Sequence, residues 1–152
     1  MAAPLIEESI DIAGTPAQVW AVVSDLARMG EWSPQCKKMV IFGGPVKLGT
    51  RTLNVNRRGP LVWPTSSKVV AFEPSREIAW RIAENNTVWG FEITETENGT
   101  RVTQRRTAPG GETSKVSSFL VDKVFGGNDG FEVELAAGMR ETLGKVKRVV
   151  EA

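Results

Sequence analysis

The stretch from Asp129 to Val150 constrains the fold more than any other part of the sequence. Its apolar side chains recur at steps of three, four and one, which places them in one stripe on a helix of 3.6 residues per turn. The stripe comprises Phe131, Leu135, Met139, Thr142 (through its methyl group), Leu143, Val146, Val149 and Val150. Acidic residues cluster in the first turn and basic residues in the last, as the helix dipole favours. One amphipathic helix is not stable alone in water, so the rest of the chain must supply an apolar face that covers it.

Alternating apolar and polar side chains predict seven strands before that helix. The first spans 5–12, and six more follow one another at 35–42, 50–57, 61–72, 77–84, 88–96 and 101–107. Asn98-Gly99 is the clearest hairpin signal between them. Pro64 predicts an edge or a bulge, because proline cannot donate a ladder hydrogen bond. The sequence therefore favours an antiparallel sheet.

Helical segments interrupt or follow these strands at three places. Thr15-Pro16 predicts a helix start, with threonine as the N-cap and proline as the first helical residue. A second short helical piece precedes Pro34. A further short helix is expected over 113–125, where glycines on both sides make it either a lid or a packed connector. Gly138, inside the long helix, predicts a close approach of another segment.

Composition narrows the class of protein and of chemistry. The 152 residues suit a single domain over 1–152, and a net charge of +1 gives no reason to expect nucleic acid as a partner. Neither a signal peptide nor a spanning segment is expected, so we predict a cytoplasmic protein without stable membrane insertion. The single cysteine, Cys36, fits a reducing compartment and is expected to be a small buried hydrophobe. Since the chain has no histidine, Ser-His and Cys-His nucleophile pairs and most zinc sites are excluded. We expect no metal and no cofactor.

The order of these elements and several local motifs resemble a known family. The motifs are Ile10–Trp20 (IDIAGTPAQVW), Val23–Leu26 (VSDL) with Glu31-Trp32, Gly49–Arg51 (GTR), Phe72–Arg76 (FEPSR) with Trp80, Asn98–Thr103 (NGTRVT), and Gly138–Leu143 (GMRETL) with Lys147. Over nearly the whole chain the sequence is similar to the START-like (SRPBCC) superfamily of polyketide cyclases/dehydrases and lipid-transfer proteins. The resemblance implies an α+β helix-grip fold, in which a curved seven-stranded antiparallel sheet wraps a long C-terminal helix and two short helices follow the first strand. It also implies a cavity for an apolar ligand between the sheet and that helix.

Aromatic residues on the strands are the first candidates for lining such a cavity. Trp80, Trp89 and Trp63 fall on the strand faces that carry Ile78, Ile82, Phe91 and Ile93. Large aromatic walls are typical of apolar pockets, although tryptophan also serves as plain core packing. With Phe91 from the sheet and Leu135 and Met139 from the helix stripe, these residues form the predicted ligand wall.

Polar residues that alternate onto the same faces are the candidates for holding a polar end of the ligand. Gln104 and Arg106 share a strand face with Val102, and Arg57 shares one with Leu53 and Val55. A buried arginine requires a carboxylate, a phosphate or another anion, which a ligand can supply. The alternative is that the strand ends before Arg106 and leaves its guanidinium in water.

Three functions remain open from the sequence. The first is non-catalytic binding of a small hydrophobic molecule such as a lipid, an isoprenoid or a polyketide. The second is a polyketide cyclase or dehydratase that polarises a carbonyl with Arg106, Gln104 or Arg57. No general base is assigned, because Glu31 and Asp25 fit capping or rim roles better. The third is an interaction module without a ligand, in which tryptophan and phenylalanine fill the interior. For any of the three, the protein is expected to be a monomer or a homodimer.

Overall fold

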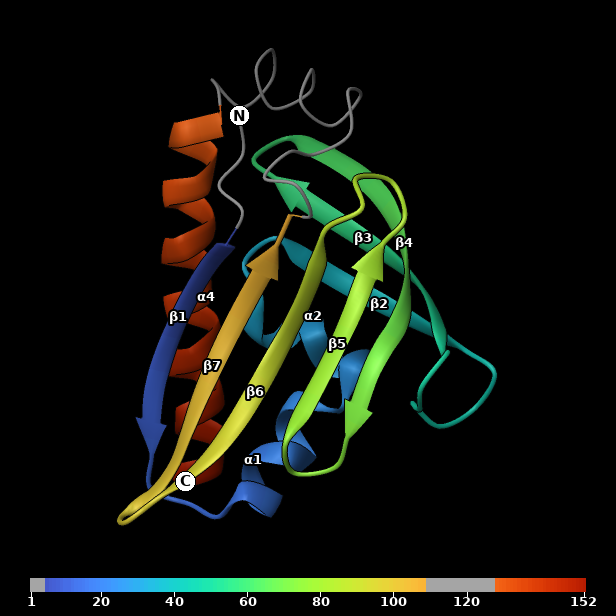
Figure 1. Ribbon diagram of the computed structural model, residues 1–152. Helices are drawn as coiled ribbons and strands as arrows, with labels where there is room; N and C mark the ends of the chain where they lie inside the picture. Colours follow the sequence, from blue (N-terminus) through green and yellow to red (C-terminus); the bar gives the residue numbers. More distant parts are fainter. Residues whose placement is uncertain (1–4, 109–127) are drawn as a thin grey trace.

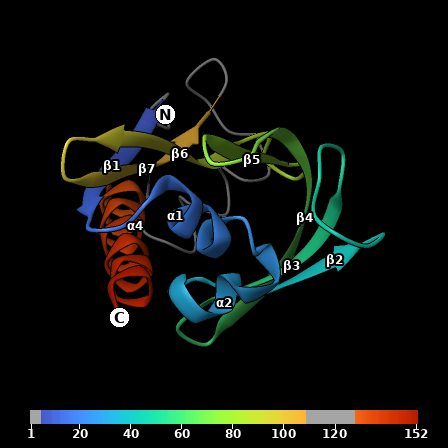
Figure 2. The same cartoon turned by 90° about the horizontal axis from the view of Figure 1, so that it is seen from below.

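The computed structural model describes residues 5–108 and 128–152 of the chain. A curved sheet of seven antiparallel strands holds the long helix α4 and the short helices α1 and α2 on its concave side (Figures 1 and 2). The elements are β1 (Leu5–Ile12), α1 (Pro16–Val23), the 3-10 helix η1 (Leu26–Arg28), α2 (Met29–Trp32), β2 (Cys36–Phe42), β3 (Arg51–Arg58), β4 (Leu61–Glu73), β5 (Glu77–Ile82), β6 (Val88–Thr96), β7 (Gly99–Thr107) and α4 (Asn128–Glu151). This arrangement confirms the predicted α+β helix-grip fold. The helix predicted over 113–125 lies outside the described residues.

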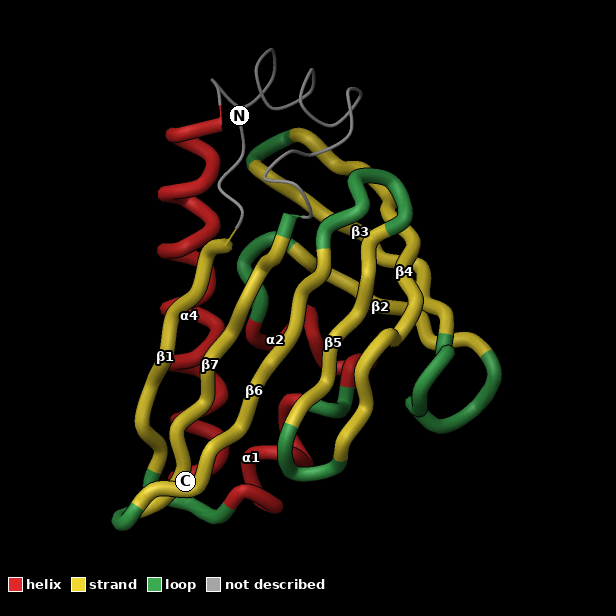
Figure 3. Tube along the Cα trace, in the orientation of Figure 1, coloured by secondary structure: helices red, strands yellow, loops and turns green. Residues whose placement is uncertain are grey.

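The strand order is β1-β7-β6-β5-β4-β3-β2, so the six later strands form consecutive hairpins and β1 pairs with the last of them (Figure 3). The β6–β7 hairpin turns at Glu97 and Asn98, with Thr96 paired to Gly99. Gly99 is required there because a β-carbon on it would clash with the carbonyl oxygen of Ile12. The predicted hairpin is thus present, with its turn one residue earlier than Asn98-Gly99.

The first helix begins as its sequence predicts. The Thr15 hydroxyl accepts a hydrogen bond from the Gln18 backbone N–H at 3.1 Å, and the Gln18 side chain accepts one from the Thr15 N–H at 2.8 Å. This reciprocal capping box satisfies two backbone donors at the helix start, while Pro16 occupies the first turn. Buried valines of α1 then join the core under the sheet.

The start of β4 is a partial edge, as Pro64 predicts. Pro64 pairs with Val55 of β3, whereas β5 joins β4 only from Ser67 onward. The nitrogen of Pro64 therefore interrupts no ladder on the β5 side. The register irregularity in β4 lies further along, between Val69 and Ala71.

Helix α4 lies along β1 and covers the β1–β7 side of the concave face (Figures 1 and 2). Leu135, Met139, Leu143 and Val146 of its apolar stripe are buried, whereas Val149 is exposed. Leu143 and Val146 join the main core, and Leu135 and Met139 form a second, smaller cluster with Ile6 of β1. Within the described ranges, no helix is long and apolar enough to cross a bilayer.

Candidate ligand-binding site

A row of side chains crosses the concave face of the sheet at the level of Arg106. Strand register places Arg106 between Ile6 of β1 and Trp89 of β6, and Trp89 opposite Trp80 of β5. Arg106 is only 4% exposed, so β7 does not release this side chain to water. The guanidinium is therefore held in the interior beside aromatic rings, where charge interactions are strengthened by the low local dielectric.

The neighbouring row contains the second predicted polar residue. Gln104 lies between Glu8 of β1 and Phe91 of β6, and is 6% exposed. Its amide oxygen is buried and has no hydrogen-bond partner among the described residues. Glu8 cannot serve it, because a carboxylate is also an acceptor; the Glu8 carboxylate instead accepts a hydrogen bond from Arg140 of α4 at 2.9 Å. A buried acceptor without a donor costs free energy that a suitable ligand would recover.

Aromatic and aliphatic side chains surround these two polar groups. Trp80 and Phe91 are buried, with ring centroids 6.1 Å apart and an interplanar angle of 45°. Trp89 is half-buried and packs against both apolar clusters. Leu135 and Met139 of α4 close the arrangement from the helix side. The fold thus brings together seven of the nine predicted site residues.

Arg57 does not join this group, and the predicted orientation of its strand was wrong. Arg57 and Leu53 are exposed, and the Arg57 Nε atom donates to the carbonyl oxygen of Gly59 at 2.9 Å. The residues of β3 that face the interior are the alternate ones, Thr52 and Asn54, which are each 2% exposed. Because side chains alternate along a strand, an error of one residue exchanges all the inward-facing side chains with the outward-facing ones.

The side chains that replace the expected apolar ones form a polar ladder, which sequence reasoning missed. It consists of Thr52, Asn54 and Asn56 on β3 with Thr65 and Ser67 on β4. Thr52 donates to Asn54 at 2.8 Å and shares a short hydrogen bond with Ser67. Asn54 and Asn56 both donate to Thr65, at 3.2 and 3.0 Å. The repeated polar residues at every second position of both strands were the available signal.

Trp63, the ninth predicted residue, lies at the end of this ladder. It is half-buried and pairs with Asn56, whose amide donates to the Trp63 carbonyl at 3.3 Å. Beyond it, Arg58 at the end of β3 donates to the Glu134 carboxylate of α4 at 2.7 Å. This ion pair ties the tip of the β3–β4 hairpin to the first half of the long helix.

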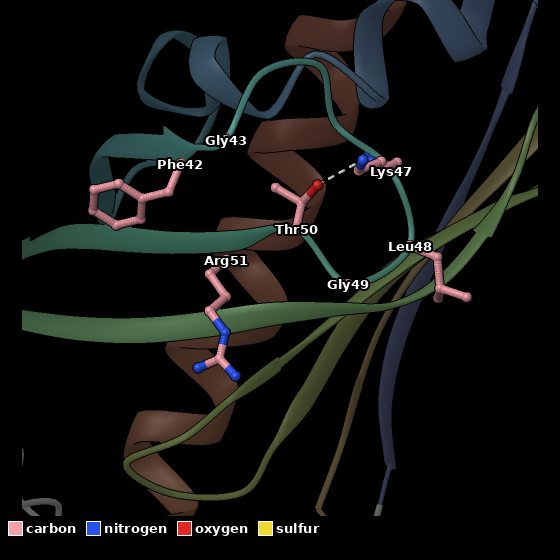
Figure 4. Close-up of a pocket in the computed structure, with 7 residues that line it drawn as sticks. All are labelled: Phe42, Gly43, Lys47, Leu48, Gly49, Thr50 and Arg51. Atoms are coloured by element: carbon pink, nitrogen blue, oxygen red, sulfur yellow. Dashed lines mark hydrogen bonds between the residues drawn. The ribbon is translucent and has the colours of Figure 1, made fainter.

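Cys36 and a pocket at the surface are less suited to ligand binding than the group around Gln104 and Arg106. Burial raises the pKa of the Cys36 thiol to about 11, which opposes a reactive role. A pocket of about 330 Å³ is formed at the β2–β3 connection by Phe42, Gly43, Lys47, Leu48, Gly49, Thr50 and Arg51. Figure 4 shows Phe42, Leu48 and Arg51 pointing away from one another around this loop, so their side chains do not converge on a ligand.

Structural comparison places this architecture among solved proteins. A solution structure of a polyketide cyclase-like protein from Corynebacterium glutamicum is 32% identical, with a TM-score of 0.67 over 98% of this chain and 92% of that one. The di-domain ARO/CYC proteins StfQ and BexL, from the steffimycin and BE-7585A biosynthetic pathways, share the fold at 16% and 20% identity. Their TM-scores are 0.75 and 0.71, and the match covers 97% of this chain and half of each di-domain chain.

Comparison of the sequence with family models identifies the same group. No curated protein matches the sequence. The model described as "Polyketide cyclase / dehydrase and lipid transport" matches residues 4–151. That match covers both the sheet and the helix that carry the candidate site, from β1 to the end of α4. This chain therefore belongs to the polyketide cyclase/dehydrase and lipid-transport family.

Proposed function

We propose that the protein binds a small hydrophobic molecule between the concave face of the sheet and α4, with a polar end held by Gln104 and Arg106. The observation that carries this proposal is the buried amide oxygen of Gln104, which has no hydrogen-bond partner in the described part of the chain and lies beside a buried arginine. A buried acceptor of this kind is expensive to hold in an apolar interior, and a ligand that donates a hydrogen bond to it would lower that cost. Membership of a family that includes lipid transport supports a hydrophobic ligand.

The two groups specify the polar end of the ligand. Arginine only donates hydrogen bonds, so it favours a carbonyl, a carboxylate or an enolate oxygen. The Gln104 amide oxygen only accepts hydrogen bonds, so it favours a hydroxyl or enol proton on a neighbouring atom. Because Gln104 and Arg106 are two residues apart on one strand face, a hydroxy-carbonyl group fits them better than an isolated alcohol.

The polar ladder on β3 and β4 supports a ligand that is not a plain alkyl chain. The polar ladder of Thr52, Asn54, Asn56, Thr65 and Ser67 faces the same concave side as Trp80. A saturated chain gains nothing from hydroxyl and amide groups, whereas an oxygenated, polyketide-like molecule can exchange hydrogen bonds with them. We therefore rank an oxygenated hydrophobic ligand above a fatty acid.

A second candidate function is cyclase or dehydratase activity on such a ligand. The ARO/CYC relatives and the description of the family favour it. In this reading Arg106 and Gln104 hold a carbonyl and a hydroxyl, and the positive guanidinium stabilises the negative charge that develops on the carbonyl oxygen. The surrounding protein would hold the substrate in one conformation and so orient its reacting groups.

Ligand titration followed by tryptophan fluorescence tests the binding proposal. The probes are lauric acid, farnesol and a hydroxyanthraquinone carboxylic acid, which differ in their polar groups. We expect the hydroxyanthraquinone to bind most tightly, and Gln104→Leu and Arg106→Met each to weaken it about tenfold, since one buried hydrogen bond contributes ~1–2 kcal/mol.

Arg105→Met is the matched control, because Arg105 is the intervening residue of β7 and pairs on the other face with Glu7 and Glu92. It should leave all three affinities unchanged. Binding that is equally tight in the Gln104 and Arg106 variants would contradict the proposal, as would the absence of binding by all three probes. Conversion of a linear poly-β-keto thioester to a cyclised product, lost in Arg106→Met, would establish the second function.

A further inference from the structure

Charge is strongly segregated along this chain although its net charge is only +1. Residues 32–72 contain seven lysines and arginines and no aspartate or glutamate. The remainder of the chain therefore has 12 basic and 18 acidic residues, a net charge of −6. The basic segment builds β2, β3 and β4, so the positive charge is concentrated at one end of the sheet. Such asymmetry favours an anionic partner at that end.

Two cations of this segment stand in register with a third, on β5, across the convex face of the sheet. Strand pairing places Arg51 of β3 opposite Lys68 of β4, and Lys68 opposite Arg81 of β5. All three side chains are exposed, and none forms an ion pair within the described part of the chain. Glu84, three residues beyond Arg81, is bound instead to the N–H and hydroxyl of Ser66. We call Arg51, Lys68 and Arg81 the cationic row.

The other end of the same face is built in the opposite way. Arg105 of β7 donates to Glu7 of β1 and Glu92 of β6, each at 2.7 Å, and Arg101 donates to Asp11 at 2.9 Å. Like charges directly opposite one another on neighbouring strands destabilise a sheet, whereas opposite charges stabilise it. The protein thus has a paired arrangement on β1, β6 and β7 and an unfavourable one on β3, β4 and β5.

Exposed apolar side chains border the cationic row. Phe42 of β2 lies directly opposite Arg51 and is 53% exposed, and Leu48 in the adjoining loop is 62% exposed. Leu53, two residues from Arg51 on the same face, is also exposed. Figure 4 shows Phe42 at the end of β2 and Leu48 in the loop that leads to Arg51. A mixture of cations and exposed hydrophobic groups is typical of surfaces that bind proteins.

We infer that the cationic row, with Phe42 and Leu53, docks an acidic amphipathic helix of another protein. Adjacent strands hold the cations about 4.8 Å apart, and carboxylates at positions i, i+4 and i+7 of a helix lie at a similar spacing of about 5–6 Å. Apolar residues beside those carboxylates would meet Phe42 and Leu53. An ordered line of acids compensates the repulsion that the register imposes.

Other occupants fit the row less well. A lipid surface is laterally fluid, so cations spread over the face would serve it equally and the in-register repulsion would bring no gain. On the same face of a second copy of this chain, the acids Glu7, Glu92 and Asp11 are already bound by Arg105 and Arg101. Both remain outcomes of the experiment below.

Binding of two synthetic helical peptides tests the inference. One has glutamates at i, i+4 and i+7 flanked by leucines, and the other has the same composition with its glutamates distributed around the helix. We expect the first to bind the full-length protein at least tenfold more tightly, and its affinity to fall as sodium chloride is raised from about 50 to about 500 mM. Lys68→Glu should weaken binding at least tenfold.

The same variant gives a second readout of opposite sign. The introduced carboxylate would lie between Arg51 and Arg81, so Lys68→Glu should raise the melting temperature while it removes binding. Lys37→Glu is the matched control, since Lys37 is an exposed cation of the basic segment outside the row, and it should leave peptide affinity within about twofold.

Three results would overturn the inference. Equal affinity for the two peptides, or no binding of the first at low salt, would exclude an acidic amphipathic helix as the partner. Unchanged peptide affinity in Lys68→Glu would show that the cationic row is not the binding surface. Association of the protein with phosphatidylglycerol vesicles, or a concentration-dependent dimer, that is lost in Lys68→Glu without discrimination between the peptides would assign the row to a lipid surface or to a second copy.

Discussion

The Cγ atom of Pro34 lies 3.1 Å from the position that a β-carbon on Gly138 would occupy. The loop after α2 therefore packs directly on the backbone of α4, which explains a glycine inside a long helix. Gly144, further along the same helix, has no atom within 4 Å of the corresponding position. The two glycines thus serve different ends, although the sequence shows both simply as interruptions of an amphipathic pattern.

Substitution of these two glycines should change stability in opposite directions. Gly144→Ala should raise the free energy of unfolding by about 0.5–1 kcal/mol, because alanine is the better helix former and nothing crowds it. Gly138→Leu should lower it by about 1–3 kcal/mol through overpacking against Pro34. Urea denaturation measures both. A destabilised Gly144→Ala would show that this position has a role the packing does not explain.

The polar ladder should contribute to stability through Asn54, which is fully buried. Asn54 accepts a hydrogen bond from Thr52 and donates one to Thr65. Asn54→Leu should lower the free energy of unfolding by about 1–3 kcal/mol, because both hydroxyls lose a partner. Asn56→Leu, at a half-buried position of the same strand, is the control and should cost less. Equal losses in the two variants would contradict the importance of burial here.

The Cys36 thiol should be unreactive in the folded protein at neutral pH. Burial raises its pKa to about 11, so about one molecule in a thousand carries the thiolate at pH 8. Iodoacetamide should modify Cys36 slowly in buffer and rapidly in urea. Because the folded-state pKa is raised, the corresponding stability is present below the ordinary thiol pKa and is lost as the pH rises toward 11. Equal rates in buffer and urea would show an exposed thiol.

The contact between the end of α4 and the β1–α1 loop should depend on acid pH. The Glu151 carboxylate accepts hydrogen bonds from the Ala13 N–H and from Lys147, which together hold its pKa below the usual value. A lowered folded-state pKa contributes stability above the ordinary carboxyl pKa of about 4.3, and this is lost as the pH falls further. Glu151→Gln should therefore unfold at lower urea than the wild type at pH 7, and at nearly the same urea at pH 3. A difference of equal size at both pH values would refute the ionic origin.

Local patterns were sufficient for the elements and for part of the site. The alternation in β5, β6 and β7 correctly predicts that Trp80, Phe91 and Val102 are buried. Once Val102 faces the core, Gln104 and Arg106 must face it too, because side chains on a strand alternate strictly. The amphipathic stripe likewise predicts the burial of Leu135 and Met139. Whether these residues bind a ligand remains a prediction.

Only the tertiary structure determined which face of β3 is buried. Its two faces carry Leu53 and Val55 on one side and Thr52 and Asn54 on the other, and hydrophobicity alone favours burying the first pair. The fold buries the second pair because the register with β4 sets Thr52 opposite Ser67 and Asn54 opposite Thr65, so each polar group finds a partner. Hydrogen-bond partners on another strand are not visible in a local pattern. For the same reason the sequence determined the strands and their periods, whereas the polar ladder, the cationic row and the Pro34–Gly138 contact depend on which residues the fold sets side by side.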